Sequence, residues 1–174
     1  MKTRLAFRHL IPRSLMGLMD IESEIDQSPL GARLLHLVKM RASQINGCAY
    51  CLDMHSKDAR AEGESEQRLY ALNAWAETPF FDKRERAALL WTEAVTRMSE
   101  DHVPDQVYEA VRGEFTDQEL AYLTLAIATI NAWNRLSITL RSSPRDYQPG
   151  MRRKIRETLS RRLAPALLEG RMEP

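Results

Sequence analysis

Apolar residues recur at intervals of three and four positions along most of the chain, and alternating apolar and polar positions are scarce. That spacing places apolar side chains on one face of an α-helix, so the pattern predicts an all-α fold. The expected helices cover residues 13–26, 32–44, 48–62, 65–75, 83–98, 104–115 and 119–141, and a further helix begins near residue 151. A chain of 174 residues is long enough for one well-buried core, and we expect a compact helical bundle.

Capping residues mark several of these boundaries. Ser65 and Asp82 stand at the N-cap positions of two helices, and Gly63 is a suitable stop for the helix before Ser65. Thr116 and Glu119 form a capping box that opens the longest apolar stretch, which we expect to run through the middle of the fold. The helix at 32–44 is expected to bury Leu34, Leu35, Leu37, Val38 and Ala42.

The C-terminal 24 residues, 151–174, differ from the rest of the chain in charge. They contain seven Lys or Arg and three Asp or Glu, whereas the whole chain has a formal net charge of only +1. Ile155, Leu159 and Leu163 share one side of a helix here, so we expect a basic amphipathic extension. Such a helix covers a neighbouring subunit or stays solvated more often than it binds a membrane surface or an acidic partner.

Overall composition limits which cellular locations and which classes of binding partner we expect for the protein. The near-neutral charge gives no indication of nucleic-acid binding. No stretch approaches the 18 apolar residues of a membrane span, and the basic N-terminus lacks the apolar run of a signal peptide. We therefore expect a cytoplasmic protein. In that reducing compartment, a pair of cysteines is better explained by catalysis or metal binding than by a structural disulfide.

Both cysteines lie in one stretch, SQINGCAYCLDMH, at residues 43–55. If Asn46-Gly47 is a turn and a helix begins near Cys48, then Cys48, Cys51 and His55 share one helical face. The partial positive charge of a helix N-terminus and a nearby imidazole both favour the reactive thiolate. Because side chains at i and i+3 are close, a small adjustment closes a disulfide. The stretch therefore predicts redox chemistry.

The block SQINGCAYCLDMHSKDARAEGESEQRLYALNAW resembles the alkyl hydroperoxidase D-like branch of the carboxymuconolactone decarboxylase superfamily, whose signature is Cys-x-x-Cys-x-x-x-His. The resemblance extends over residues 10–150. It implies one domain of this type at 1–150, followed by the extension at 151–174. It also implies a helical bundle that assembles into a homotrimer or a homohexamer.

The resemblance further implies a thiol-dependent alkyl hydroperoxide reductase, a peroxiredoxin-like antioxidant peroxidase. Cys51 is then the thiolate that attacks an organic hydroperoxide, Cys48 is the thiol that condenses with it, and His55 moves the proton. His36 stands twelve residues before Cys48, where the family usually has glutamate, and it is the fourth candidate catalytic residue. Asn131 and Asn134 are expected to hold the site or an interface together.

No glycine-rich dinucleotide fingerprint occurs in the chain, so we expect no bound nicotinamide or flavin cofactor. The electrons should come from an external dithiol: a lipoylated protein, a thioredoxin or a small thiol. Three alternatives stay open. The protein could be a carboxymuconolactone decarboxylase-type lyase, which needs no thiol pair. It could be a zinc-binding module with Cys48, Cys51, His55 and His36 as ligands. It could also be a redox-responsive interaction module.

Overall fold

The structure is a computed structural model that describes residues 2–144 and 147–168, and within those ranges the regular elements are all helical, which confirms the predicted fold class. The first half contains η1 (Phe7–His9), α1 (Pro12–Asp26), α2 (Ala32–Asn46), α3 (Ala49–Ala61), α4 (Glu66–Ala71) and η2 (Leu72–Glu77). The second half contains α5 (Lys83–Thr96), α6 (Met98–Asp101), α7 (Asp105–Arg112), α8 (Asp117–Leu140) and α9 (Met151–Leu168).

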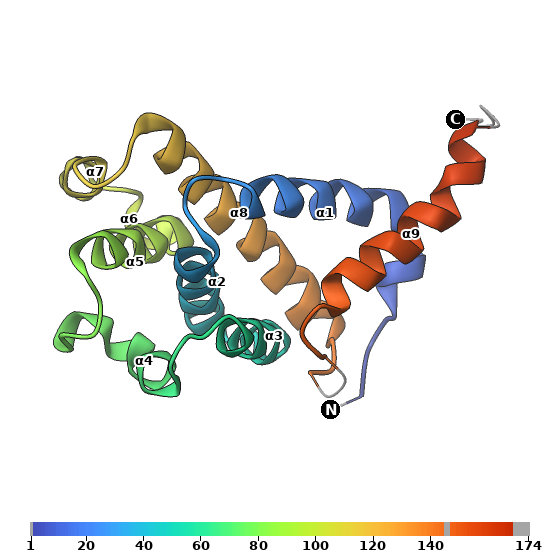
Figure 1. Cartoon of the computed structure of the whole chain (residues 1–174), viewed down its shortest axis with the longest axis horizontal. Coiled ribbons are helices and arrows are strands. Elements are labelled where there is room, and N and C mark those ends of the chain that lie inside the picture. Colours follow the sequence, from blue (N-terminus) through green and yellow to red (C-terminus); the bar gives the residue numbers. More distant parts are fainter. Residues whose placement is uncertain (1, 145–146, 169–174) are drawn as a thin grey trace.

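The longest helix, α8, crosses the middle of the molecule (Figure 1) and packs against α1, α2, α3 and α5. The predicted capping box is present, because Thr116 Oγ1 accepts from the backbone of Glu119 while the Glu119 carboxylate accepts from the backbone of Thr116. Leu123 and Ile127 are fully buried, but Leu125 is exposed. The central position was predicted correctly, although one side of the helix faces solvent in the single chain.

The helix α2 lies beside α8 and carries the five apolar side chains that were expected in the core, all of which are buried. The main apolar cluster joins α2 to α5 and α8. Burial of each such side chain contributes on the order of 1.5–3 kcal/mol. This packing fixes α2, which supports the cysteine-containing turn at its C-terminal end.

The prediction of one helix over residues 65–75 was wrong in its second half. The α-helix α4 begins after Ser65, as expected, but ends at Ala71, and the chain continues as the 3₁₀ helix η2 with a non-helical Ala74. The guanidinium of Arg86 on α5 donates to the carbonyl oxygens of Trp75, Ala76 and Thr78. This contact comes from the next helix, so the pattern of apolar residues within 65–75 did not predict it.

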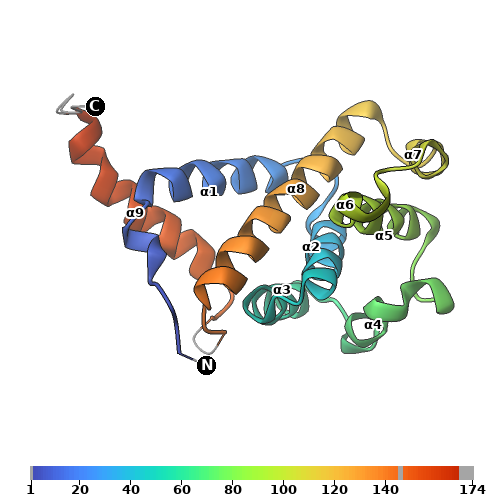
Figure 2. The ribbon, with the colours of Figure 1, turned by 180° about the vertical axis from the view of Figure 1, so that it is seen from behind.

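The helices α1 and α9 lie together on the side of α8 away from α5 and α7, and Figure 2 shows the same arrangement from behind. Ile155 and Leu159 pack against Phe7 and Leu15, so this end of the extension covers a helix of its own chain. The side chain of Leu163 lies outside the described residues. Within residues 2–144 and 147–168, no helix is both long and apolar enough to cross a membrane.

Candidate active site

The turn between α2 and α3 places both cysteines at the start of a helix, as predicted. Gly47 is the C-cap of α2 with φ of 70° and ψ of 33°, and the backbone N–H of Cys48 donates to the carbonyl of Ser43 at 2.9 Å. Cys48 is the N-cap of α3, and its Sγ accepts from the backbone N–H of Cys51 at 3.3 Å. Cys51 therefore lies in the first helical turn, where unpaired amides favour negative charge.

Buried amides on α8 hold this turn in place. The side-chain amide of Asn46 donates to Oδ1 of Asn131 and of Asn134, both at 2.8 Å. Asn134 in turn donates to Oγ of Ser43 at 3.0 Å. The two asparagines of α8 thus satisfy their own polar groups and anchor the cysteine-containing turn, in the structural role that was expected for them.

Cys48 and Cys51 are joined by a disulfide, and each is only 1% exposed. They pack with Ala42 and Ile130, so the sulfur pair lies between α2, α3 and α8. Cys51 also lines a cavity that opens towards α1 and α9. The fold therefore shields the sulfurs from bulk water while giving Cys51 access to an internal space.

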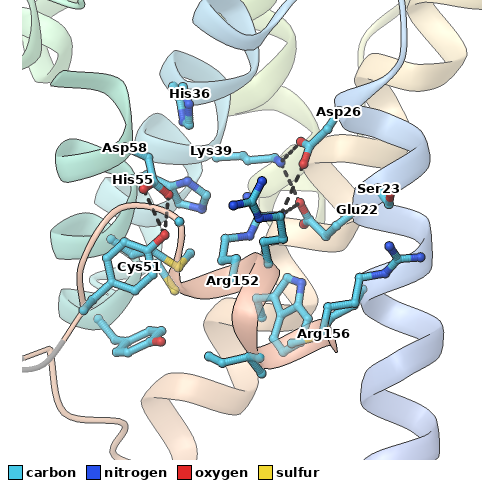
Figure 3. A pocket seen from close by; sticks show the side chains of 18 of the residues that line it. Glu22, Ser23, Asp26, His36, Lys39, Cys51, His55, Asp58, Arg152 and Arg156 are labelled. Atoms are coloured by element: carbon cyan, nitrogen blue, oxygen red, sulfur yellow. Dashed lines mark hydrogen bonds and ion pairs between the residues drawn. The ribbon is translucent and has the colours of Figure 1, made fainter. Parts of the chain in front are cut away.

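His55 lies one turn after Cys51 on the same face of α3 and lines the same cavity (Figure 3). The side chain is 1% exposed, and no hydrogen-bond partner for its Nδ1 occurs in the described part of the chain. Burial, and then the nearby charges of Lys39, Arg152 and His36, hold the pKa of His55 well below its usual value. The imidazole is therefore neutral at pH 7.

The structure brings His36 of α2 into the same cavity as His55, with ring centroids 6.0 Å apart. His36 is 7% exposed, and its Nε2 lies 3.2 Å from Oε2 of Glu62. The four residues selected from the sequence thus lie in one region of the fold. His36 is reached from a different helix, so its position depends on the packing of α2 against α3.

Asp58 and Tyr147 belong to the same region, and the sequence analysis missed both. The Tyr147 hydroxyl lies 2.9 and 2.7 Å from the two carboxylate oxygens of Asp58 and donates to them. Burial raises the pKa of Asp58, and the Tyr147 hydrogen bond opposes that rise. Asp58 follows Cys51 by seven residues on one helical face, so spacing alone could have identified it. Nothing in the sequence pairs it with Tyr147.

A group of four charges, of which Lys39 and Glu22 are buried, forms the opposite wall of the cavity (Figure 3). The ammonium of Lys39, which is 1% exposed, lies 2.6 Å from Glu22 and 3.2 Å from Asp26. The Arg152 guanidinium lies 2.7 Å from the same oxygen of Glu22. Two cations and two carboxylates balance each other here, as buried charges require. Nothing in the sequence pattern predicted this cluster.

The cavity between these walls has a volume of about 590 Å³. Its apolar lining residues are Phe7, Leu15, Met19, Leu35, Met54, Trp133 and Ile155. Arg8 closes one side by donating to the hydroxyl of Tyr50 at 2.5 Å. The site therefore combines an apolar space with a sulfur, two imidazoles and a buried carboxyl group.

The zinc interpretation can be compared with the arrangement of His, Cys, Asp and Glu side chains in the described residues. No group of three or more His, Cys, Asp or Glu side chains there is arranged to hold a metal ion. The two thiols that the zinc interpretation needs are joined to each other.

Comparison with known proteins relates these features to other chains. The model of the carboxymuconolactone decarboxylase family matches residues 12–94, a range that contains both cysteines and both cavity histidines. The uncharacterized protein YdfG of Bacillus subtilis (strain 168) is 41% identical over 140 residues, which are 80% of this chain and 95% of that protein.

Solved structures share the fold. A protein of unknown function from Agrobacterium tumefaciens, for which a role as the antioxidant defence protein AhpD has been suggested, is 40% identical with a TM-score of 0.80. The match covers 84% of this chain and all of that one. An uncharacterized peroxidase-related protein from Silicibacter sp. TM1040 is 23% identical with a TM-score of 0.69, over 78% of this chain and 72% of that one. This second likeness concerns the fold alone.

Proposed function

The chain belongs to the carboxymuconolactone decarboxylase family, and from this membership and the geometry of the site we propose that it is a thiol-dependent hydroperoxide reductase. One observation carries the proposal. Cys48 and Cys51 are bonded to each other at the N-terminus of α3, and a neutral imidazole lies one turn further along the cavity wall. A sulfur pair in this setting is suited to alternate between dithiol and disulfide.

Reduction of the hydroperoxide follows from these groups. In the dithiol state, His55 accepts the proton of Cys51, and the helix N-terminus stabilises the resulting thiolate. The thiolate attacks one peroxide oxygen, the O–O bond breaks, and the departing alkoxide takes the proton from His55 to give an alcohol. Cys51 is left as a sulfenic acid. The Cys48 thiol then attacks that sulfur, the disulfide forms and water leaves.

An external dithiol completes the cycle. One of its thiolates attacks the Cys48–Cys51 disulfide and forms a mixed disulfide, and its second thiol displaces the protein sulfur. The reductant loses two electrons and two protons, and the two cysteines regain them. A lipoylated protein, a thioredoxin or a small thiol fits this role. His36 is proposed as a second proton carrier, because it shares the cavity with His55.

The cavity favours an organic hydroperoxide over hydrogen peroxide. A volume of about 590 Å³ falls in the range of sites that bind whole organic ligands. Its lining includes Met19, Met54 and Trp133, which can contact a hydrocarbon body. The antioxidant defence role suggested for the relative from Agrobacterium tumefaciens agrees with this proposal.

The proposal is tested by turnover of the purified protein. With cumene hydroperoxide and dithiothreitol, the wild type should consume peroxide catalytically, whereas Cys51→Ser should be inactive. Without dithiothreitol, Cys48→Ser should consume a single equivalent of peroxide and stop as the sulfenic acid, because the condensing thiol is missing. Equal rates in Cys51→Ser and the wild type would eliminate the mechanism.

The same protein separates this function from the lyase alternative. Alkylation of both reduced cysteines should abolish peroxide consumption. A decarboxylase that works through acid–base groups should keep its activity after the same treatment. Carbon dioxide release from a carboxylated muconolactone, before and after alkylation, is the measurement.

A further inference from the structure

Glu62 ends α3 and connects the buried imidazoles with solvent. Its Oε2 lies 3.2 Å from Nε2 of His36. The side chain of Glu62 is 51% exposed, whereas that of His36 is 9% exposed. The reaction steps described above give Glu62 no role. Its position, however, places one end of a carboxylate in water and the other beside a cavity histidine.

Further inside the protein, beyond Glu62, two buried nitrogen atoms lack hydrogen-bond partners. The Nδ1 atoms of His36 and His55 are both buried, and neither has a hydrogen-bond partner within the part of the chain that the structure describes. A carboxylate beside Nε2 favours a proton on that nitrogen and leaves Nδ1 of His36 free to accept or pass on a proton. The ring centroids are 6.0 Å apart and the two Nδ1 atoms have no partner in the described part of the chain, so a proton would pass between the rings through water.

We propose that Glu62 is the positioning residue of a proton path that runs from solvent through His36 and His55 to Cys51. Glu62 holds the imidazole of His36 in one orientation and one tautomer. It also exchanges protons with bulk water. The inference rests on the proposed function, since it assigns the route by which protons return to the two cysteines of the same site.

The chemistry of the sulfur pair explains why such a path is needed. When an external dithiol reduces the disulfide, two S–H groups must form on sulfurs that are each 1% exposed. A thiolate expelled into this buried space is costly until a proton reaches it. The reductant supplies the two electrons and releases two protons to solvent, and the path returns two protons to Cys48 and Cys51.

The test uses reduction of the disulfide, which requires no peroxide. Wild-type protein in the oxidised state is mixed with excess dithiothreitol, and thiol formation is followed by rapid quench and alkylation. Glu62→Gln should slow this step by at least about tenfold, a smaller loss than the roughly 10²–10⁴-fold that removal of a general acid itself causes. The solvent deuterium isotope effect on the step should rise in the same variant.

Rescue and a matched control distinguish a proton path from a structural effect. Glu62→Ala should regain speed with added formate, because the position is open to solvent and a small carboxylate can occupy it. Glu66, on the neighbouring helix α4, is the matched control. Its side chain is 53% exposed, and its carboxylate lies 2.8 Å from the guanidinium of Arg60. Glu66→Gln should reduce at the wild-type rate, and Glu66→Ala should not respond to formate.

Two results would overturn the inference. One is a Glu62→Gln variant that is reduced at the wild-type rate, and the other is equal slowing in the Glu66→Gln control. Neither result bears on peroxide consumption by the wild type, so the proposed function is judged separately by the Cys51→Ser comparison.

Discussion

Asp58 is a buried carboxyl group whose hydrogen-bond donor, Tyr147, comes from the segment that leads into α9. The ammonium of Lys57 also donates to the backbone carbonyl of Tyr147, at 3.1 Å. Two adjacent residues of α3 therefore fasten the segment that closes the cavity. A buried polar group that loses its partner costs about 1–3 kcal/mol.

Tyr147→Phe should therefore lower the free energy of unfolding by about 1–3 kcal/mol, because it leaves the Asp58 carboxylate without its donor. Asp58→Asn should cost less at pH 7, since an amide oxygen still accepts from Tyr147 and no charge is buried. Urea unfolding of the two variants measures the difference. A larger loss in Asp58→Asn than in Tyr147→Phe would contradict this assignment.

The same residue predicts a dependence on pH. The pKa of Asp58 is raised in the folded state, chiefly by burial, so its favourable contribution is complete below the unfolded value and is lost as pH rises through the folded value. The free energy of unfolding of Asp58→Asn, relative to that of the wild type, should therefore be higher at pH 7 than at pH 4.

The effect of His55 on the pH dependence of stability is opposite to that of Asp58. Its pKa is lowered in the folded state by burial and by neighbouring cations. Below pH 6.5 the imidazole binds a proton in the unfolded chain but stays neutral in the folded protein. The free energy of unfolding therefore decreases as the pH is lowered, by up to about 1.4 kcal/mol per pH unit. His55→Gln should flatten this fall between pH 6.5 and 5. Unfolding free energies at several pH values, with wild type alongside, provide the check.

At the scale of single elements, the left-handed turn at Gly47 controls where α3 begins. Its φ of 70° is rarely adopted by residues with a side chain, although a Cβ there would meet nothing within 4 Å. Gly17 lies inside the helix α1 and also has open space around it. The two glycines are therefore a matched pair in which only the backbone conformation differs.

Alanine substitution at these two positions should change the stability of the protein in opposite directions. Gly47→Ala should destabilise the protein by about 1–2 kcal/mol because of left-handed strain. Gly17→Ala should stabilise it by roughly 0.5–1 kcal/mol, since alanine favours a helix interior. Thermal unfolding of both variants gives the comparison. Equal effects of the two substitutions would show that strain at Gly47 is not the cause.

At the scale of the whole molecule, the cluster of Lys39, Glu22, Asp26 and Arg152 joins α2, α1 and α9. Three helices that are distant in sequence thus share one set of compensating charges. Breaking a buried pair from one side costs more than the pair contributes, because the remaining charge has no partner. The cluster therefore couples the position of α9 to the rest of the fold.

Glu22→Gln should be the most damaging single change in this cluster, with a loss of about 3–5 kcal/mol, because it removes the nearest carboxylate of both cations and leaves them only the half-exposed Asp26. Arg152→Gln should cost less, since Lys39 still pairs with both carboxylates. Denaturant midpoints measured side by side decide the order. The reverse order would show that Arg152 is the main partner of Glu22.

The homotrimer or homohexamer implied by the family resemblance stays a prediction, as do the boundary at residue 150 and the cytoplasmic location. Leu125 and Ile138 of α8 are exposed in the single chain. Light scattering would give three or six times the chain mass of 20.0 kDa if the prediction is right.

Local chemistry in the sequence determined the helical class, the capping box at Thr116, the glycine turn and the shared face of Cys51 and His55. These features depend on residues a few positions apart, so spacing and backbone preference are enough to predict them. Tertiary packing alone decided that Glu62 lies beside His36, that Tyr147 donates to Asp58, and that Arg86 binds the carbonyls at the end of η2. Each of these contacts joins different elements, and their geometry exists only once the helices have packed.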